Sequence, residues 1–131
     1  MRMIDCCKDS FTCRSSSRLL FDLDSTVVTS FGHQEGAEVG YNPRYRGKRS
    51  YDPLLCVEAN SSFLWDVELR RGDAGSWAGG EDLLTCCFLS SPSDIREFRA
   101  RADAGFGYGP LLDMLESVLP SILWLRAWSL P

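Results

Sequence analysis

The chain has 131 residues, the usual size of a single folded domain, and its 44% hydrophobic content is ordinary for a globular protein. Acidic residues outnumber basic ones by 18 to 14, which excludes a general electrostatic attraction to nucleic acid. Any contact with DNA must therefore come from a local basic patch. The apolar stretch 111–130 is interrupted by Asp113, Glu116, Pro120 and Arg126, so we expect no membrane span.

The six cysteines do not form a zinc-binding pattern. They include two adjacent pairs but no CxxC pair, and the chain has a single histidine, His33. The first residues contain no apolar segment of the kind that signal peptides have. We therefore expect buried, reduced thiols in a cytoplasmic protein.

The amino-terminal part of the chain divides into three segments. Residues 1–17 are polar and rich in cysteine and serine, which predicts a loose leader. Residues 18–31 are rich in aliphatic and β-branched side chains and predict the first strand. Residues 32–53 contain several glycines and no apolar periodicity, which predicts a long loop with a functional role.

The remainder of the chain alternates between strand and helix patterns. The predicted strands are residues 54–58, 62–69, 95–102 and 122–128. The predicted helices are residues 81–89 and 110–119. Asn60-Ser61 suits a hairpin turn between the first two of these strands. The resulting order, β-β-β-α-β-α-β, predicts one α/β domain with a mixed sheet over residues 18–131.

Three aspartates are candidates for metal-dependent chemistry. The two-residue period of a strand places Asp22 and Asp24 on the same face, where a divalent cation would offset their mutual repulsion. Asp103 closes the strand predicted over 95–102. If that strand is a neighbour of the first, Asp24 and Asp103 can share a Mg²⁺ or Mn²⁺ ion of the kind that supports attack on a phosphodiester. The same spacing also occurs for solvated acids at strand ends, and that interpretation stays open.

A run of basic and aromatic residues lies within the predicted loop, and no acid interrupts it. Its members are Tyr41, Arg44, Tyr45, Arg46, Lys48 and Arg49. Lysine and arginine neutralise phosphates, and tyrosine can stack on unpaired bases. The run predicts a DNA-binding surface, with an ordinary solvated loop as the alternative.

Three sequence motifs resemble a known family. The stretch LLFDLDSTVVTSFGHQEGAEVGYNPRYRGKRSYDPLL resembles the first catalytic block of insertion-sequence DDE transposases, and ELRRGDAGSWAGG and RARADAGFG resemble later parts. The resemblance covers residues 18–126. It implies an RNase H-like fold in which Asp24 matches the first catalytic aspartate and Asp103 the second. It also implies Mg²⁺ or Mn²⁺ as cofactor, transposon ends and target DNA as partners, and relatives that dimerise on DNA.

The sequence departs from this family in two places. The family's third catalytic acid is a glutamate on a helix far downstream, and Glu116 follows Asp103 too closely to match it. Residues 1–17 resemble no part of the family's amino-terminal DNA-binding region. The resemblance therefore implies an incomplete catalytic domain that is close to inactive alone, with weak metal binding and strand transfer close to nil.

Two other functions fit parts of the sequence. The motif DLDST also fits the start of haloacid-dehalogenase-like phosphatases, with Asp22 as nucleophile and Asp24 as general acid and base. That mechanism needs a later lysine, and the only lysine after Lys8 is Lys48, within the basic run. A non-catalytic DNA-binding remnant, which uses the basic run without chemistry, is the second alternative.

Overall fold

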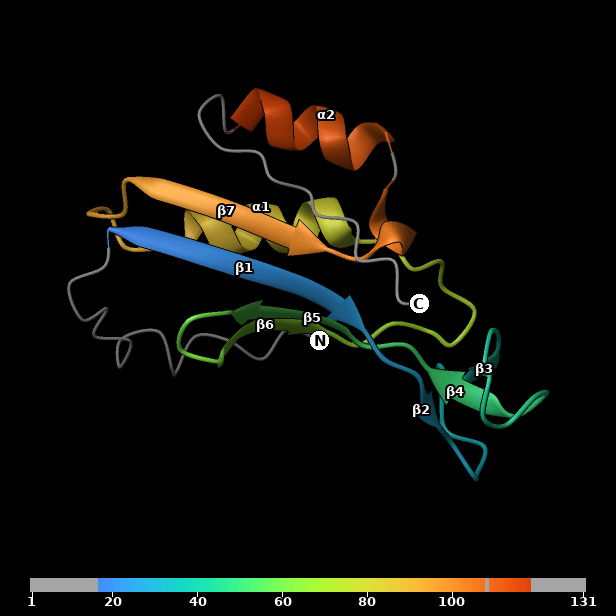
Figure 1. Cartoon of the computed structure of the whole chain (residues 1–131). Coiled ribbons are helices and arrows are strands. Elements are labelled where there is room, and N and C mark those ends of the chain that lie inside the picture. Colours follow the sequence, from blue (N-terminus) through green and yellow to red (C-terminus); the bar gives the residue numbers. More distant parts are fainter. Residues whose placement is uncertain (1–16, 108, 119–131) are drawn as a thin grey trace.

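The computed structural model describes residues 17–107 and 109–118, and its main element is a four-stranded sheet in the order β6-β5-β1-β7 (Figure 1). The strands are β1 (Arg18–Ser25), β5 (Leu54–Glu58), β6 (Phe63–Glu68) and β7 (Glu97–Ala102). Strand β5 is antiparallel to both of its neighbours, whereas β7 is parallel to β1. The mixed α/β class and the hairpin between the second and third predicted strands are thereby confirmed.

A second, smaller sheet lies beyond the carboxyl end of β1 (Figure 1). It consists of β2 (Val28–Thr29), β4 (Arg49–Tyr51) and β3 (Glu38–Val39), paired antiparallel in that spatial order. Two predictions were therefore wrong. The strand expected over 18–31 is broken after Ser25, and residues 32–53 are not one continuous loop. Strands of two or three residues are too short to show the alternation by which strands are found in a sequence.

One helix follows β6 in the chain and a second follows β7, and both lie within one residue of the predicted bounds. They are α1 (Gly80–Leu89) and α2 (Gly109–Val118). Gly79 precedes α1 with φ of 81°, a left-handed conformation that glycine adopts without strain. Glu81 and Asp82 lie in the first turn, where their negative charge interacts favourably with the helix dipole. The strand predicted over 122–128 and the leader 1–16 lie outside the described residues.

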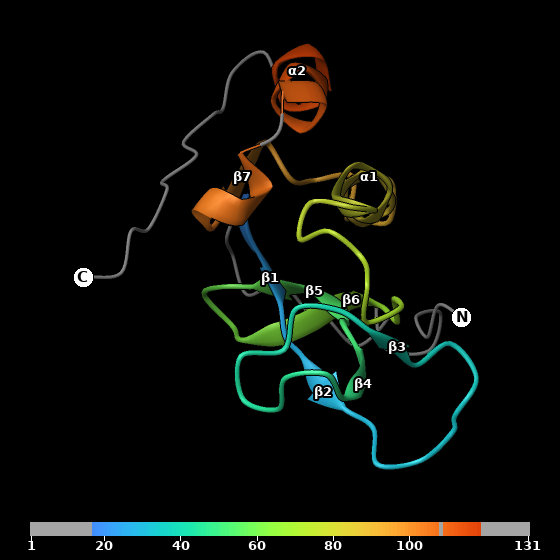
Figure 2. The same cartoon turned by 90° about the vertical axis from the view of Figure 1, so that its right-hand side faces the viewer.

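The hydrophobic core lies between the main sheet and the two helices, which cover the same face (Figure 2). Leu19, Phe21 and Leu23 project from β1 into this core. The ring of Phe21 lies 5.3 Å from that of Trp65 and 5.7 Å from that of Phe88. Because side chains alternate along a strand, Leu20, Asp22 and Asp24 project to the opposite face.

A β-bulge in β6 changes the alternation that the sequence predicts for residues 62–69. The pairing of β5 with β6 shifts between Cys56 and Val57, so Trp65 is the additional residue in β6. Trp65 and Asp66 are consequently both buried, although a regular strand would place them on opposite faces. Trp65 belongs to the hydrophobic core.

The cysteines in the described part of the chain are free thiols. Cys56 on β5 and Cys87 on α1 are buried, and Cys86 is half-buried. The hydrogen bond with Cys87, together with burial, raises the pKa of Cys56 well above its usual range, so this thiol stays protonated. The helices within residues 17–107 and 109–118 lack the length and apolar character of a membrane span.

Candidate functional site

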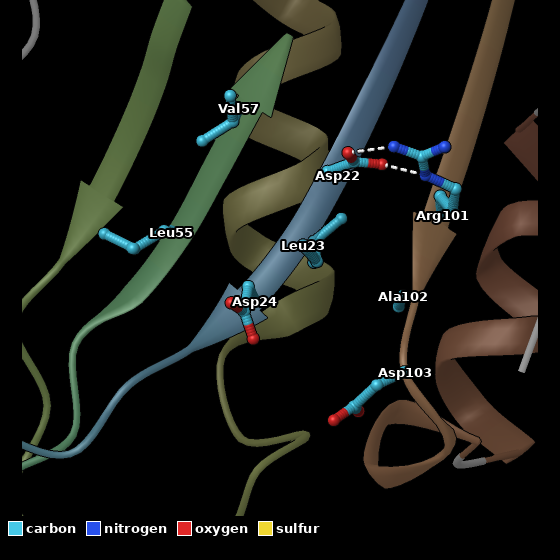
Figure 3. A pocket seen from close by; sticks show the side chains of 8 residues that line it. All are labelled: Asp22, Leu23, Asp24, Leu55, Val57, Arg101, Ala102 and Asp103. Carbon is cyan, nitrogen blue, oxygen red and sulfur yellow. Dashed lines mark hydrogen bonds and ion pairs between the residues drawn. The ribbon is translucent and has the colours of Figure 1, made fainter. Parts of the chain in front are cut away.

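The pairing of β1 with β7 brings Asp24 and Asp103 to the same end of the sheet. Asp22 is opposite Arg101 and Leu23 is opposite Ala102, so Asp24 and Asp103 each follow one residue later. Carboxyl ends of neighbouring parallel strands lie at one edge, where binding groups in α/β sheets gather. Both side chains are exposed and line one pocket of about 460 Å³ (Figure 3). Asp103 follows β7, which ends at Ala102, rather than closing it.

Each of these two carboxylates is held by a backbone amide. Ser25 N donates to Asp24 Oδ1 at 2.9 Å, and Gly105 N donates to Asp103 Oδ1 at 2.9 Å. The second bond forms within the turn of the 3-10 helix Ala104–Phe106, where Phe106 N also donates to the Asp103 carbonyl. Both carboxylates are thus oriented while an oxygen of each is left to face the pocket.

Asp22 lies in the same pocket, but its negative charge is balanced by an ion pair with Arg101. Nε and Nη2 of Arg101 donate to its two carboxylate oxygens across the β1–β7 pair. Arg101 therefore offsets the charge of Asp22, whereas the sequence predicts that a divalent cation offsets the charge of both Asp22 and Asp24. Sequence reasoning missed Arg101. The alternation in RARAD places it on one face with Arg99, but only the register with β1 reveals its partner.

A buried ion pair lies beside this site. Arg70 Nη2 donates to Asp52 Oδ2 at 2.9 Å, and both side chains are at least nine-tenths buried. Burial raises the pKa of Asp52, and the nearby Asp24 carboxylate adds to this effect, although Arg70 opposes it. Asp24 therefore lies close enough to Asp52 to raise the pKa of the Asp52 carboxyl.

Arg70 also fixes the loop that leads into α1. Its Nη1 donates to the carbonyl oxygens of Gly75, Ser76 and Ala78, at 3.1, 3.1 and 2.6 Å. Ser76 in turn lies against Gly105, since a Cβ atom at Gly105 would lie 3.2 Å from Ser76 Cβ. The loop thereby supports the turn that holds Asp103. Sequence reasoning missed Arg70 because its partners are distributed over separate segments.

The donor set at Asp24 and Asp103 fits part of a divalent-metal site. Within residues 17–107 and 109–118, no group of three or more histidine, cysteine, aspartate or glutamate side chains could hold a metal ion. Mg²⁺ nevertheless often binds one or two carboxylates and takes its other ligands from water and substrate phosphates. Two exposed carboxylates with free oxygens match that smaller requirement.

The basic run predicted to bind DNA lies at the small sheet. All of its side chains are exposed, that of Tyr41 at 83%. Arg49 belongs to β4, which corrects its placement in a loop, and the others lie in the β3–β4 connection. Asn42 holds this connection, since it donates to Thr29 Oγ1 and accepts from Tyr45 N, both at 2.9 Å.

The basic run and the acidic pair, Asp24 and Asp103, lie toward the same end of the molecule. The small sheet continues from the carboxyl end of β1, the end at which Asp24 lies (Figure 1). The small sheet also lies close to the connection between β6 and α1, because a Cβ atom at Gly40 would lie 1.8 Å from the carbonyl oxygen of Gly72. Only glycine allows so close an approach of two backbones.

The chain matches no family model, no curated protein and no solved structure.

Proposed function

We propose that this chain is part of the catalytic domain of a DDE-type transposase, with an RNase H-like fold. The observation that carries the proposal concerns Asp24 and Asp103, the two residues that match the family's first and second catalytic aspartates. They lie far apart in the sequence, yet they line one pocket from the ends of adjacent strands. The element order β-β-β-α-β-α, once the three short strands are set aside, also agrees with the fold that the resemblance implies.

The proposed chemistry is hydrolysis and strand transfer at DNA phosphodiesters. A bound Mg²⁺ or Mn²⁺ would activate a water or a DNA 3′-hydroxyl and stabilise charge on the phosphodiester. Asp24 and Asp103 would each contribute a carboxylate oxygen, oriented by Ser25 N and Gly105 N. These hydrogen bonds from backbone amides hold the carboxylates in place before an ion binds, which limits the reorganisation that metal binding requires.

DNA binding is assigned to the basic run. Its four cations are exposed, and no acidic residue lies among them. Each phosphate that they neutralise releases counterions, so binding should weaken steeply with salt. The tyrosines at positions 41 and 45 offer ring faces to unpaired bases near the cut.

The phosphatase alternative is disfavoured by the state of Asp22. As a nucleophile it would need a free carboxylate oxygen aimed at substrate, but Arg101 holds both of its oxygens. Lys48, the only later lysine, lies exposed in the β3–β4 connection and forms no part of the pocket around Asp22.

The proposal is tested by nicking of a supercoiled plasmid in Mn²⁺. We expect slow nicking that requires Mn²⁺ and falls at least tenfold in Asp24→Ala, because that carboxylate is one of the two metal ligands. Asp94→Ala is the matched control, since Asp94 is exposed and lies outside the pocket, and it should nick like the unchanged chain. Salt-dependent DNA binding without any nicking would instead support the non-catalytic remnant. Turnover of a small phosphate ester that is lost in Asp22→Ala would support the phosphatase.

A further inference from the structure

Arg101 has hydrogen-bonding capacity that its ion pair does not use. Its Nε and Nη2 donate to Asp22, whereas the described residues provide no partner for Nη1. The side chain is 42% exposed and forms one wall of the pocket that Asp24 and Asp103 line (Figure 3). A cation with free N–H groups therefore faces the same pocket as the two acids.

The separation between this cation and the acids suits a nucleic-acid strand. The Asp22–Arg101 pair precedes Asp24 and Asp103 by two residues on each strand. At about 3.3 Å per residue, the Asp22–Arg101 pair and the residues Asp24 and Asp103 lie about 6–7 Å apart along the strands. This is similar to the distance between consecutive phosphates of one nucleic-acid strand. Leu55 and Val57 form the adjacent part of the pocket and offer no charge of their own.

We infer that Arg101, positioned by Asp22, binds the DNA phosphate next to the phosphodiester that a metal ion at Asp24 and Asp103 would contact. The inference rests on the proposed function and adds a phosphate site to it. A guanidinium group has five N–H donors, so it can keep a carboxylate on one edge and accept a phosphate on another. Because Asp22 already fixes the side chain, little conformational freedom is lost when the phosphate binds.

Arg99 provides a matched control on the same strand. It lies two residues before Arg101 and hence on the same face of β7, and its side chain is 46% exposed. It also forms an ion pair, with Glu97 at 2.7 Å, but it does not line the pocket. Loss of Arg99 removes the same charge from the same face at a position where we expect no phosphate.

The experiment measures binding of a fluorescent DNA duplex to the whole chain by anisotropy, in EDTA and over a range of salt concentrations. We expect Arg101→Gln to weaken binding several-fold and to reduce the slope of log K against log salt by about one, the change for one lost phosphate contact. Arg99→Gln should leave both quantities close to those of the unchanged chain. Equal effects of the two substitutions would overturn the inference. Thermal melts establish that both variants fold.

Arg101→Lys separates the charge from the shape of the side chain. Lysine retains the positive charge but lacks the fork that engages Asp22 and a phosphate together. We expect this variant to keep the salt slope but to lose part of the affinity. A slope as low as that of Arg101→Gln would contradict the role of charge at this position.

Mn²⁺ binding, measured separately, distinguishes this inference from the proposed function. If Asp24→Ala abolishes Mn²⁺ binding while Arg101→Gln behaves like Arg99→Gln, the phosphate site is wrong and the metal site stands. If Arg101→Gln alone lowers the salt slope while the chain binds no Mn²⁺, the phosphate site stands and the nuclease proposal fails.

Discussion

At the scale of single residues, Glu58 is a buried carboxylate whose environment is built for its charged form. Its side chain accepts hydrogen bonds from Asn60 Nδ2 at 2.8 Å and from Ser61 N and Oγ at 2.8 and 2.6 Å. A longer bond comes from Leu20 N on β1. Burial alone would raise the pKa of Glu58, but these bonds outweigh it and lower the pKa below its usual value. Glu58 thus joins the β5–β6 turn to β1.

Glu58→Gln should therefore destabilise the fold in a pH-dependent way. At pH 7 we expect a loss of about 1.5–3 kcal/mol in the free energy of unfolding, the usual contribution of hydrogen bonds to a charged group. Because the folded-state pKa is lowered, this contribution is present above the unfolded-state pKa and disappears as the pH falls through the folded value. Urea unfolding should show the two proteins converging below about pH 4. A difference that is the same at pH 7 and pH 3 would contradict this account.

Residues whose roles depend on strand register could not be predicted. The sequence identifies Asp24 and Asp103 because acids at strand ends are visible in the pattern. It does not identify Arg101 as the partner of Asp22, because that contact joins residues 79 apart. The same holds for Arg70, whose acceptors extend from Asp52 to Ala78.

At the scale of elements, periodicity decides what the sequence reveals. Strands β5 and β6 and both helices were predicted within one residue at each end, because each has a continuous apolar pattern. The small sheet was missed because its strands are short and depend on distant contacts. One such contact is the close approach of Gly72 to Ser50. A Cβ atom added at Gly72 would lie 2.2 Å from the Ser50 carbonyl oxygen.

The loop between β6 and α1 should depend strongly on Arg70. Arg70→Met would leave Asp52 buried without its cation and the three loop carbonyls without their donor, so we expect a loss of about 3–5 kcal/mol. Arg71→Met is the matched control, since the neighbouring Arg71 is 62% exposed and its ion pairs with Glu38 and Asp73 lie at the surface. It should cost less than about 1 kcal/mol. Chemical denaturation measures both, and similar losses would refute the importance of the buried pair.

At the scale of the whole molecule, a negatively charged site and a positively charged surface lie at the same end of the main sheet. The acidic pair lies where β1 and β7 end, and the basic run lies on the small sheet that continues from β1 (Figure 1). The proposed function needs this separation, because in it the cations contact phosphates while the acids hold a metal ion. Helices α1 and α2 cover the other face of the sheet and leave the pocket open.

Mn²⁺ binding to the whole chain, followed by electron paramagnetic resonance, tests most directly whether Asp24 and Asp103 hold a common ion. We expect Asp24→Asn and Asp103→Asn each to weaken binding at least tenfold, or about 1.4 kcal/mol. The double variant should be little weaker than either single one, because the first substitution already removes the shared site. Asp94→Asn should bind like the unchanged chain. Equal Mn²⁺ affinity in all four variants would contradict the account.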